Sequence, residues 1–150
     1  MRIRRAMVED SRAMAAVNTR AYDLYEILLG YLPPPATEQP ETWIEAGHAW
    51  VGERDSEVMA LLVAEPNDGF LLVRSAVVDP DWQGEGHGRA LLEHAAALAR
   101  EAGLPELRLS TNVLMERNIS LYRHCGFRIA GSRPHPAHEA HTLADMVRAL

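Results

Sequence analysis

The chain contains no lysine at all, so its 15 basic residues are all arginine. The phosphate-binding loop of nucleoside triphosphatases ends in Gly-Lys-Ser or Gly-Lys-Thr, and the missing lysine excludes that class of loop. A single cysteine excludes an intrachain disulfide and agrees with a reducing compartment. We therefore expect a cytoplasmic protein.

No apolar run is long enough to span a bilayer, and the N-terminus lacks the apolar core of a signal peptide. No membrane partner is expected. The net charge of −6 argues against a nucleic-acid partner. With 47% hydrophobic and 24% charged residues, the composition is that of a globular protein, and 150 residues suit one domain over residues 1–150.

Hydrophobic periodicity and turn residues predict a mixed α/β chain. The predicted strands are Arg2–Arg5, Ala49–Arg54, Glu57–Glu65, Phe70–Val78, Leu107–Thr111, Phe127–Gly131 and Thr142–Ala149. The predicted helices are Asp10–Leu28, Glu41–Gly47, Gly88–Ala102 and Met115–Gly126. The prolines of Tyr31–Pro35 predict an irregular segment.

Two of these helices are predicted to be amphipathic. The buried stripe of the first is expected to contain Met14, Val17, Ala21 and Leu24. That of the third is expected to contain Leu91, Ala95, Leu98 and Ala102.

The most informative segment is Val77–Leu92, where a strand end, a turn at Asp79-Pro80 and a glycine-rich loop lead into an Ala/Leu helix. Gly84, Gly86 and Gly88 remove side chains where backbone N–H groups can approach a ligand. The unpaired donors and dipole of a helix N-terminus favour anions. This pattern predicts a pyrophosphate cradle; the other interpretation is a tight strand-to-helix turn with no ligand.

The spacing of the glycines narrows the kind of cradle. A dinucleotide-binding loop needs G-x-G-x-x-G after the first strand of the domain, whereas Gly84-x-Gly86-x-Gly88 lies more than halfway along the chain. The motif Gln83-x-x-Gly86-x-Gly88 resembles the acyl-CoA loop of the GNAT superfamily of N-acetyltransferases.

A second motif carries the same resemblance. In the predicted helix before Phe127, polar Asn118 precedes Leu121-Tyr122 and Gly126-Phe127 closes the helix, which is similar to the GNAT signature. The opening segment Ile3–Ser11 resembles the usual first strand and acidic helix start of that family. The resemblance implies the GNAT fold, a central mixed β-sheet of about seven strands flanked by about four helices.

The resemblance implies an acetyl-CoA-dependent N-acetyltransferase that releases coenzyme A as product. The expected acceptor is the primary amine of a small molecule, acetylated by direct transfer. Two alternatives stay open: acetylation of a protein or peptide terminus, and a non-catalytic module that binds acyl-CoA. A homodimer is one option for the assembly.

The resemblance also assigns roles to residues of this sequence. The backbone of Val77 and Val78 is expected to pair with the pantetheine arm. The residues expected to hold the rest of the cofactor are Gln83, Gly84, Glu85, Gly86, His87, Gly88, Arg89 and Asn118. Arg89 opposes the helix dipole unless a phosphate or solvent neutralises it.

Tyr122 is the expected general acid, which protonates the departing thiolate. A free tyrosine has a pKa of about 10, so the phenol stays protonated at neutral pH and can donate. The alternative is a half-buried tyrosine anchored by its hydroxyl. Asn118 lies four residues earlier and shares a helical face with Tyr122.

The residues that would accept the amine proton and bind the acceptor are less determined. The strand before the loop, Phe70–Val78, contains no acidic residue, so Glu65, Asp79, His135 or a water chain are the options for the general base. Three tyrosines could contact a cationic amine through their aromatic rings. They are Tyr22, Tyr25 and Tyr31.

His135, His138 and His141 are spaced three apart, a pattern that raises the question of a zinc site. Prolines interrupt any helix that would align them and no cysteine or acidic pattern completes the set, so no metal is expected. Cys125 is expected to be packed rather than nucleophilic.

Overall fold

The computed structural model describes residues 1–33 and 39–150, and it contains one seven-stranded sheet with the strand order β1-β2-β3-β4-β5-β7-β6. The strands are β1 (Arg2–Arg5), β2 (Ala49–Arg54), β3 (Glu57–Asn67), β4 (Phe70–Val78), β5 (Glu106–Asn112), β6 (Arg128–Pro134) and β7 (Thr142–Ala149). The helices are α1 (Ser11–Leu29), α3 (Pro40–Glu45), α4 (His87–Glu101) and α5 (Glu116–His124). Short 3₁₀ turns span Val8–Asp10 and Pro80–Trp82.

The predicted mixed α/β class and the order of its elements are confirmed. The strand predicted at Phe127–Gly131 extends to Pro134, because β6 pairs with β7 as far as Pro134↔Thr142. In the segment predicted to be irregular, Pro34 and Pro35 lie outside the described residues.

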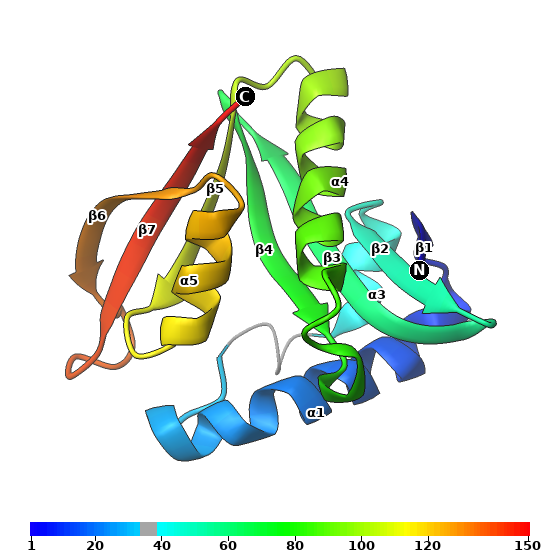
Figure 1. Ribbon diagram of the computed structural model, residues 1–150, viewed down its shortest axis with the longest axis horizontal. Coiled ribbons are helices and arrows are strands. Elements are labelled where there is room, and N and C mark those ends of the chain that lie inside the picture. The colour runs from blue at the N-terminus through cyan, green and yellow to red at the C-terminus, as the bar shows by residue number, and fades with distance from the viewer. Residues whose placement is uncertain (34–38) are drawn as a thin grey trace.

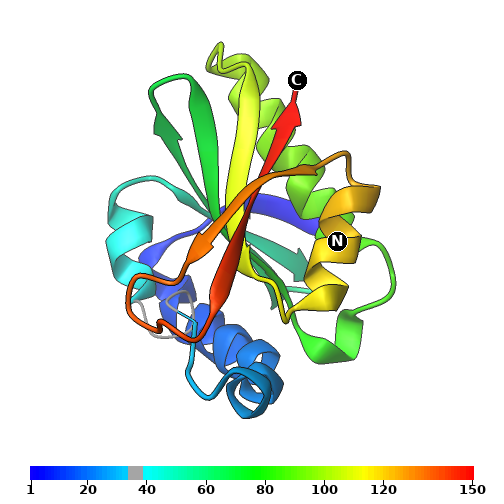
Figure 2. The ribbon, with the colours of Figure 1, turned by 90° about the vertical axis from the view of Figure 1, so that its left-hand side faces the viewer.

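Among the described residues, α4 and α5 lie on one face of the sheet and α1 and α3 on the other (Figures 1 and 2). On one face, α4 and α5 close a core that includes Leu92, Leu107 and Phe127. On the other face, α1 and α3 pack on β2, β3 and β4 around Val51 and Leu61. Neither α1 nor α3 covers β6 and β7, so no described helix lies over this end of the second face (Figure 2).

Both predicted helical stripes need correction. Leu24 is 74% exposed, because it lies on the side of α1 that faces away from the described strands. Ala102 is exposed after the last turn of α4. The buried residues of α1 are Met14, Val17, Asn18 and Leu29, and those of α4 are Leu91, Leu92, Ala95, Ala96 and Ala99.

A β-bulge changes which side chains of β4 face which layer. Val63 pairs with Ser75 whereas Ala64 pairs with Val73, so Arg74 is an extra residue in β4. Val73, before the bulge, contributes to the core under α4, and Val77, after it, contributes to the core under α1. The bulge thus shifts the alternation by one residue.

The parallel pair β4 and β5 diverges. Pairing is confined to Leu71↔Leu107 and Leu72↔Arg108, although β4 continues to Val78 and β5 to Asn112. Figure 1 shows the two strands separating towards α1. The sheet is therefore open between the carboxyl ends of β4 and β5. Among the described residues, no helix combines the length and apolar character needed to cross a membrane.

Candidate active site

Two cavities open where β4 and β5 separate. The loop cavity, about 370 Å³, lies beside the Gln83–Gly88 segment and the start of α5. The inter-strand cavity, about 320 Å³, lies between the ends of β4 and β5 and reaches the loop after β6. Tyr22, Ala76 and Asn118 line both cavities. A molecule in one cavity can therefore contact a molecule in the other.

Local interactions shape the loop between β4 and α4. The Asp79 carboxylate accepts from the backbone N–H of Asp81 at 2.9 Å and caps the 3₁₀ turn. The Gln83 side chain donates to the carbonyl oxygen of Val78 at 3.0 Å, which ties the loop to the end of β4. Gly84 and Gly86 have φ values of +83° and +85°, a left-handed conformation that disfavours side chains.

Gly88 also has a packing role. Its backbone is helical, and a Cβ there would approach Leu121 Cδ2 to 3.1 Å. Added side chains at Gly84 or Gly86 would meet nothing within 4 Å. Gly88 therefore permits close packing of α4 against α5, whereas Gly84 and Gly86 set the direction of the loop backbone.

The backbone N–H groups from Gly84 to Arg89 find no acceptor among the described residues, and the first intrahelical donor is Ala90, which bonds Gly86 O at 3.1 Å. The N-terminal end of the α4 dipole adds positive potential at the same place. This row of open donors borders the loop cavity. Such an arrangement can hold a phosphate.

The comparison with protein families identifies the fold. The family model described as Acetyltransferase (GNAT) family matches residues 18–127. The chain belongs to this family. As a GNAT member it is an N-acetyltransferase with acetyl-CoA as its acetyl donor.

Relatives and solved structures agree with this assignment. Peptidyl-lysine N-acetyltransferase YjaB of Escherichia coli (strain K12) is 28% identical over 132 residues, which cover 86% of this chain and 83% of YjaB. Mycothiol acetyltransferase of Beutenbergia cavernae is 30% identical over 124 residues, 79% of this chain and 41% of that enzyme. The crystal structure of PaiA N-acetyltransferase from Thermoplasma acidophilum, in complex with coenzyme A, has a TM-score of 0.83 at 15% identity and covers 99% and 98% of the two chains.

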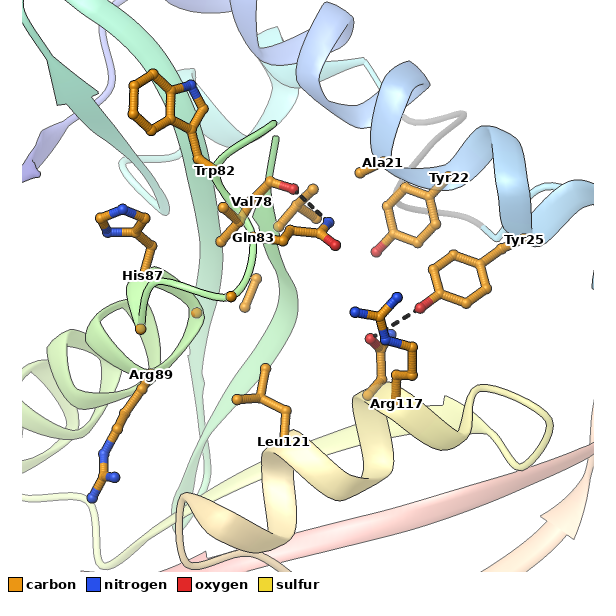
Figure 3. Close-up of a pocket in the computed structure, with 16 residues that line it drawn as sticks. Ala21, Tyr22, Tyr25, Val78, Trp82, Gln83, His87, Arg89, Arg117 and Leu121 are labelled. Atoms are coloured by element: carbon orange, nitrogen blue, oxygen red, sulfur yellow. Dashed lines mark hydrogen bonds between the residues drawn. The ribbon is translucent and has the colours of Figure 1, made fainter. Parts of the chain in front are cut away.

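Most of the residues predicted to hold the cofactor of this GNAT protein border the loop cavity. They are Val77, Val78, Gln83, Gly84, Gly86, His87, Gly88, Arg89 and Asn118. Glu85 is the exception, since it is exposed and lies 3.9 Å from His87 Nε2. The Arg89 side chain points away from the tyrosines of the cavity in Figure 3.

Five lining residues of the loop cavity were not predicted as site residues from the sequence: Ala21, Ala76, Trp82, Arg117 and Leu121. Arg117 extends from the first turn of α5 towards Tyr22 and Tyr25, and Leu121 lies one turn later (Figure 3). The available signal was the spacing of Leu121, which lies three residues after Asn118 and four after Arg117, because positions three and four residues apart share a helical face.

The predicted acceptor-site tyrosines are divided between the cavities. Tyr25 lines the loop cavity and donates to Asn118 Oδ1 at 3.3 Å, whereas Tyr31 lines the inter-strand cavity. Tyr22 lies at the junction, and burial raises its pKa to about 12. Tyr122 lines the inter-strand cavity, and burial raises its pKa above the ordinary value, with nearby Tyr22 adding to the effect.

The residues predicted as possible general bases already have ion-pair or hydrogen-bond partners in the structure. Glu65 pairs with Arg74 at 3.5 Å, and Asp79 pairs with Arg20 at 3.2 Å. No carboxylate lines either cavity in the described part of the chain. His135 lines the inter-strand cavity, but its Nδ1 accepts from the backbone N–H of Ala137 at 3.0 Å, so the lone pair of the neutral ring is occupied.

The three histidines do gather, around Tyr31. His138 stacks on the Tyr31 ring at 3.9 Å, and His135 and His141 contact its edges at 5.2 and 5.1 Å. No group of three or more His, Cys, Asp or Glu residues within the described ranges is arranged to hold a metal. Cys125 is 4% exposed, and burial raises the pKa of its thiol.

Proposed function

We propose that this GNAT enzyme transfers the acetyl group of acetyl-CoA to the primary amine of a small molecule by direct attack. The observation that carries the proposal is the contact between two cavities at Tyr22, Ala76 and Asn118. One cavity has the open donors expected for a diphosphate, and the other can hold a second reactant. An amine and a thioester bound in this way need no covalent intermediate on the protein.

In this proposal the loop cavity is the donor site. The backbone N–H groups from Gly84 to Arg89 hold the pyrophosphate, and the α4 dipole stabilises its charge. Beyond Leu72, the edge of β4 that faces β5 pairs with no described strand. We propose that the backbone of Val77 and Val78 pairs here with the amides of the pantetheine arm; the Val78 carbonyl, which accepts from Gln83 Nε2, keeps a second lone pair for such a bond.

The acetyl transfer then takes place at the junction of the cavities. The neutral amine attacks the thioester carbonyl, the C–S bond breaks, and coenzyme A leaves as a thiolate. Tyr122 donates its phenolic proton to that thiolate. Burial raises the pKa of Tyr122, so the phenol is protonated at neutral pH, and its hydroxyl has no hydrogen-bond partner among the described residues that would compete.

Water is the proposed carrier of the amine proton. The cavities contain no carboxylate from the described residues, and the lone pair of His135 is occupied. The attacking amine must therefore be neutral or lose its proton to solvent, and the same water returns a proton to Tyr122. Turnover should then rise with pH as the acceptor amine itself becomes neutral.

The test is a thermal-shift measurement with acetyl-CoA, followed by thiol release with a panel of small amines and peptides. Ligand at 100 times its Kd stabilises a fold by about 2.7 kcal/mol. We expect stabilisation by acetyl-CoA and thiol release that depends on a small amine. If only a peptide amine supports release, as the name of YjaB would suggest, the small-molecule assignment is wrong. The cytoplasmic location and the homodimer stay predictions.

A further inference from the structure

The polar groups at the outer end of the inter-strand cavity are oriented by a fixed amide. The backbone N–H of Leu114 can only donate, and it bonds Asn112 Oδ1 at 3.0 Å. The Asn112 amide nitrogen therefore faces the other way, where it donates to the Tyr31 hydroxyl oxygen and to His141 Nδ1, both at 3.0 Å. Since Asn112 is 3% exposed, this orientation is held inside the protein.

The Tyr31 hydroxyl oxygen therefore accepts a hydrogen bond from Asn112, and the Tyr31 O–H proton can be donated to another acceptor. The described residues offer it no other hydrogen-bond partner. Tyr31 lines the cavity. Its O–H is thus a donor available to a bound molecule.

His135 presents a second donor by the same reasoning. Its Nδ1 accepts from the N–H of Ala137, so the proton of the neutral ring lies on Nε2. Burial, followed by the charges of neighbouring histidines and Arg133, lowers the pKa of His135, which keeps the ring neutral at pH 7. The His135 and Tyr31 rings are 5.2 Å apart, so both donors lie at the same end of the cavity.

Arg133 supplies the charge. Its Nε donates to Asp145 Oδ2 at 3.1 Å and its Nη2 to Ser110 Oγ at 3.4 Å, which holds the guanidinium in place. Its Nη1 has no acceptor within residues 1–33 and 39–150. A second guanidinium, that of Arg74, also lines the cavity and is held by Glu65 and the Trp43 ring.

The outer end of the cavity therefore offers hydrogen-bond donors and guanidinium charge, and no described carboxylate faces it. Both guanidinium groups are ion-paired, Arg133 with Asp145 and Arg74 with Glu65, but neither carboxylate is among the described residues that line the cavity. A polycationic acceptor would therefore find no carboxylate in this lining, whereas a bound carboxylate would complete the donors of Tyr31, His135 and Arg133. On the basis of the proposed function, we propose that the acceptor is an amine that also carries a carboxylate, as an amino acid does, and that Tyr31, Arg133 and His135 bind this carboxylate.

The test uses pairs of acceptors that differ only in the carboxylate. Each α-amino acid of a panel is compared with its methyl ester and with the amine left after decarboxylation, and spermidine represents the polycations. Thiol release from acetyl-CoA gives kcat/KM for each. We expect the amino acid of a used pair to exceed both analogues by about 10- to 100-fold, the range expected for a charge-assisted hydrogen bond.

Variants locate the effect. Arg133→Met should lower this preference through KM of the acceptor, Arg133→Lys should restore part of it, and Tyr31→Phe should lower it while keeping the ring that stacks on His138. Arg128→Met is the matched control, since Arg128 lies on the same strand β6 but does not line this cavity. The KM for acetyl-CoA should not change in any of them.

Failure of this inference and failure of the proposed function give different results. Equal use of amino acid and decarboxylated amine, or preference for spermidine, overturns the inference while transfer stands. If acetyl-CoA binds but no amine is acetylated, the proposed function fails. Calorimetry on the coenzyme A complex then decides the inference. The inference is supported if N-acetylated amino acids bind, their amides do not bind, and Arg133→Met abolishes the binding. Equal binding of the acids and the amides, or no binding of either, refutes it.

Discussion

Replacing Tyr122 by phenylalanine removes the proposed proton donor with little structural change. The ring packs against Phe127 at 5.9 Å between centroids, and the substitution keeps it. The hydroxyl forms no hydrogen bond with a described residue, so no buried partner is left unpaired. We expect the free energy of unfolding to change by about 0.5 kcal/mol or less, because no hydrogen bond is lost.

The expected effect on catalysis is much larger. A positioned general acid contributes about 10²- to 10⁴-fold to a rate, and the lower figure corresponds to about 2.7 kcal/mol in the barrier. Tyr122 does not line the loop cavity, so acetyl-CoA should bind the variant as it binds the wild type. The kcat should therefore fall at least 100-fold, by about 2.7 kcal/mol, with the KM for acetyl-CoA unchanged.

The assay is thiol release at saturating acetyl-CoA across pH, with Tyr22→Phe measured in parallel. Burial raises the pKa of Tyr122, so wild-type turnover should fall only above about pH 10, where the phenol ionises, and the Tyr122→Phe variant should lack that fall. Tyr22 also reaches the junction of the cavities. If Tyr22→Phe loses the turnover and Tyr122→Phe keeps it, the reasoning about the proton donor is refuted.

Three further predictions test the loop, the cysteine and the fold. Gly84→Ala and Gly103→Ala each place a side chain in a left-handed conformation with open space around it, so both variants should lose about 1–2 kcal/mol of stability in denaturant. Only Gly84→Ala should weaken acetyl-CoA binding. If both variants weaken binding equally, the assignment of the cradle is contradicted. Cys125→Ala should retain turnover, and the native thiol should resist alkylation because it is buried with a raised pKa; loss of activity by alkylation would count against this. The hydrogen bond from Arg4 lowers the pKa of Asp10, so this carboxylate stabilises the fold above its unfolded pKa, and the contribution is lost as the pH falls through its folded pKa. The Asp10→Asn variant should therefore be less stable than the wild type by about 1–3 kcal/mol at pH 7, and this difference should shrink in acid. A difference that stays constant with pH would exclude the ion pair as the cause.

The sequence was sufficient for most of the secondary structure and for the segment that borders the loop cavity. The β-branched end of β4, the turn at Asp79-Pro80 and the glycines are adjacent in the chain, so local rules predict a strand, a loop and a helix N-terminus there. The loop cavity is built mostly from this continuous segment. Its residues could therefore be named, although the contact between Gly88 and Leu121 could not.

The acceptor end was beyond local rules. Asn112 and Tyr31, 81 positions apart, share a hydrogen bond, and Asn112 also fixes His141. The bond from Leu114 to Asn112 is local, but the partners of the Asn112 amide nitrogen, Tyr31 and His141, lie far away in the chain, and no sequence spacing encodes them. The same holds for Arg133, since its place beside the cavity follows from how far β6 extends along β7.

By itself, then, the sequence determined which segments are strands and helices, the family, and the glycine loop, because hydrophobic period and turn chemistry act between neighbouring residues. Only the tertiary structure decided where β4 bulges at Arg74, where β4 leaves β5, and that two cavities meet at Tyr22 and Asn118. These features depend on packing between segments far apart in the chain, which the pattern within any one segment does not specify.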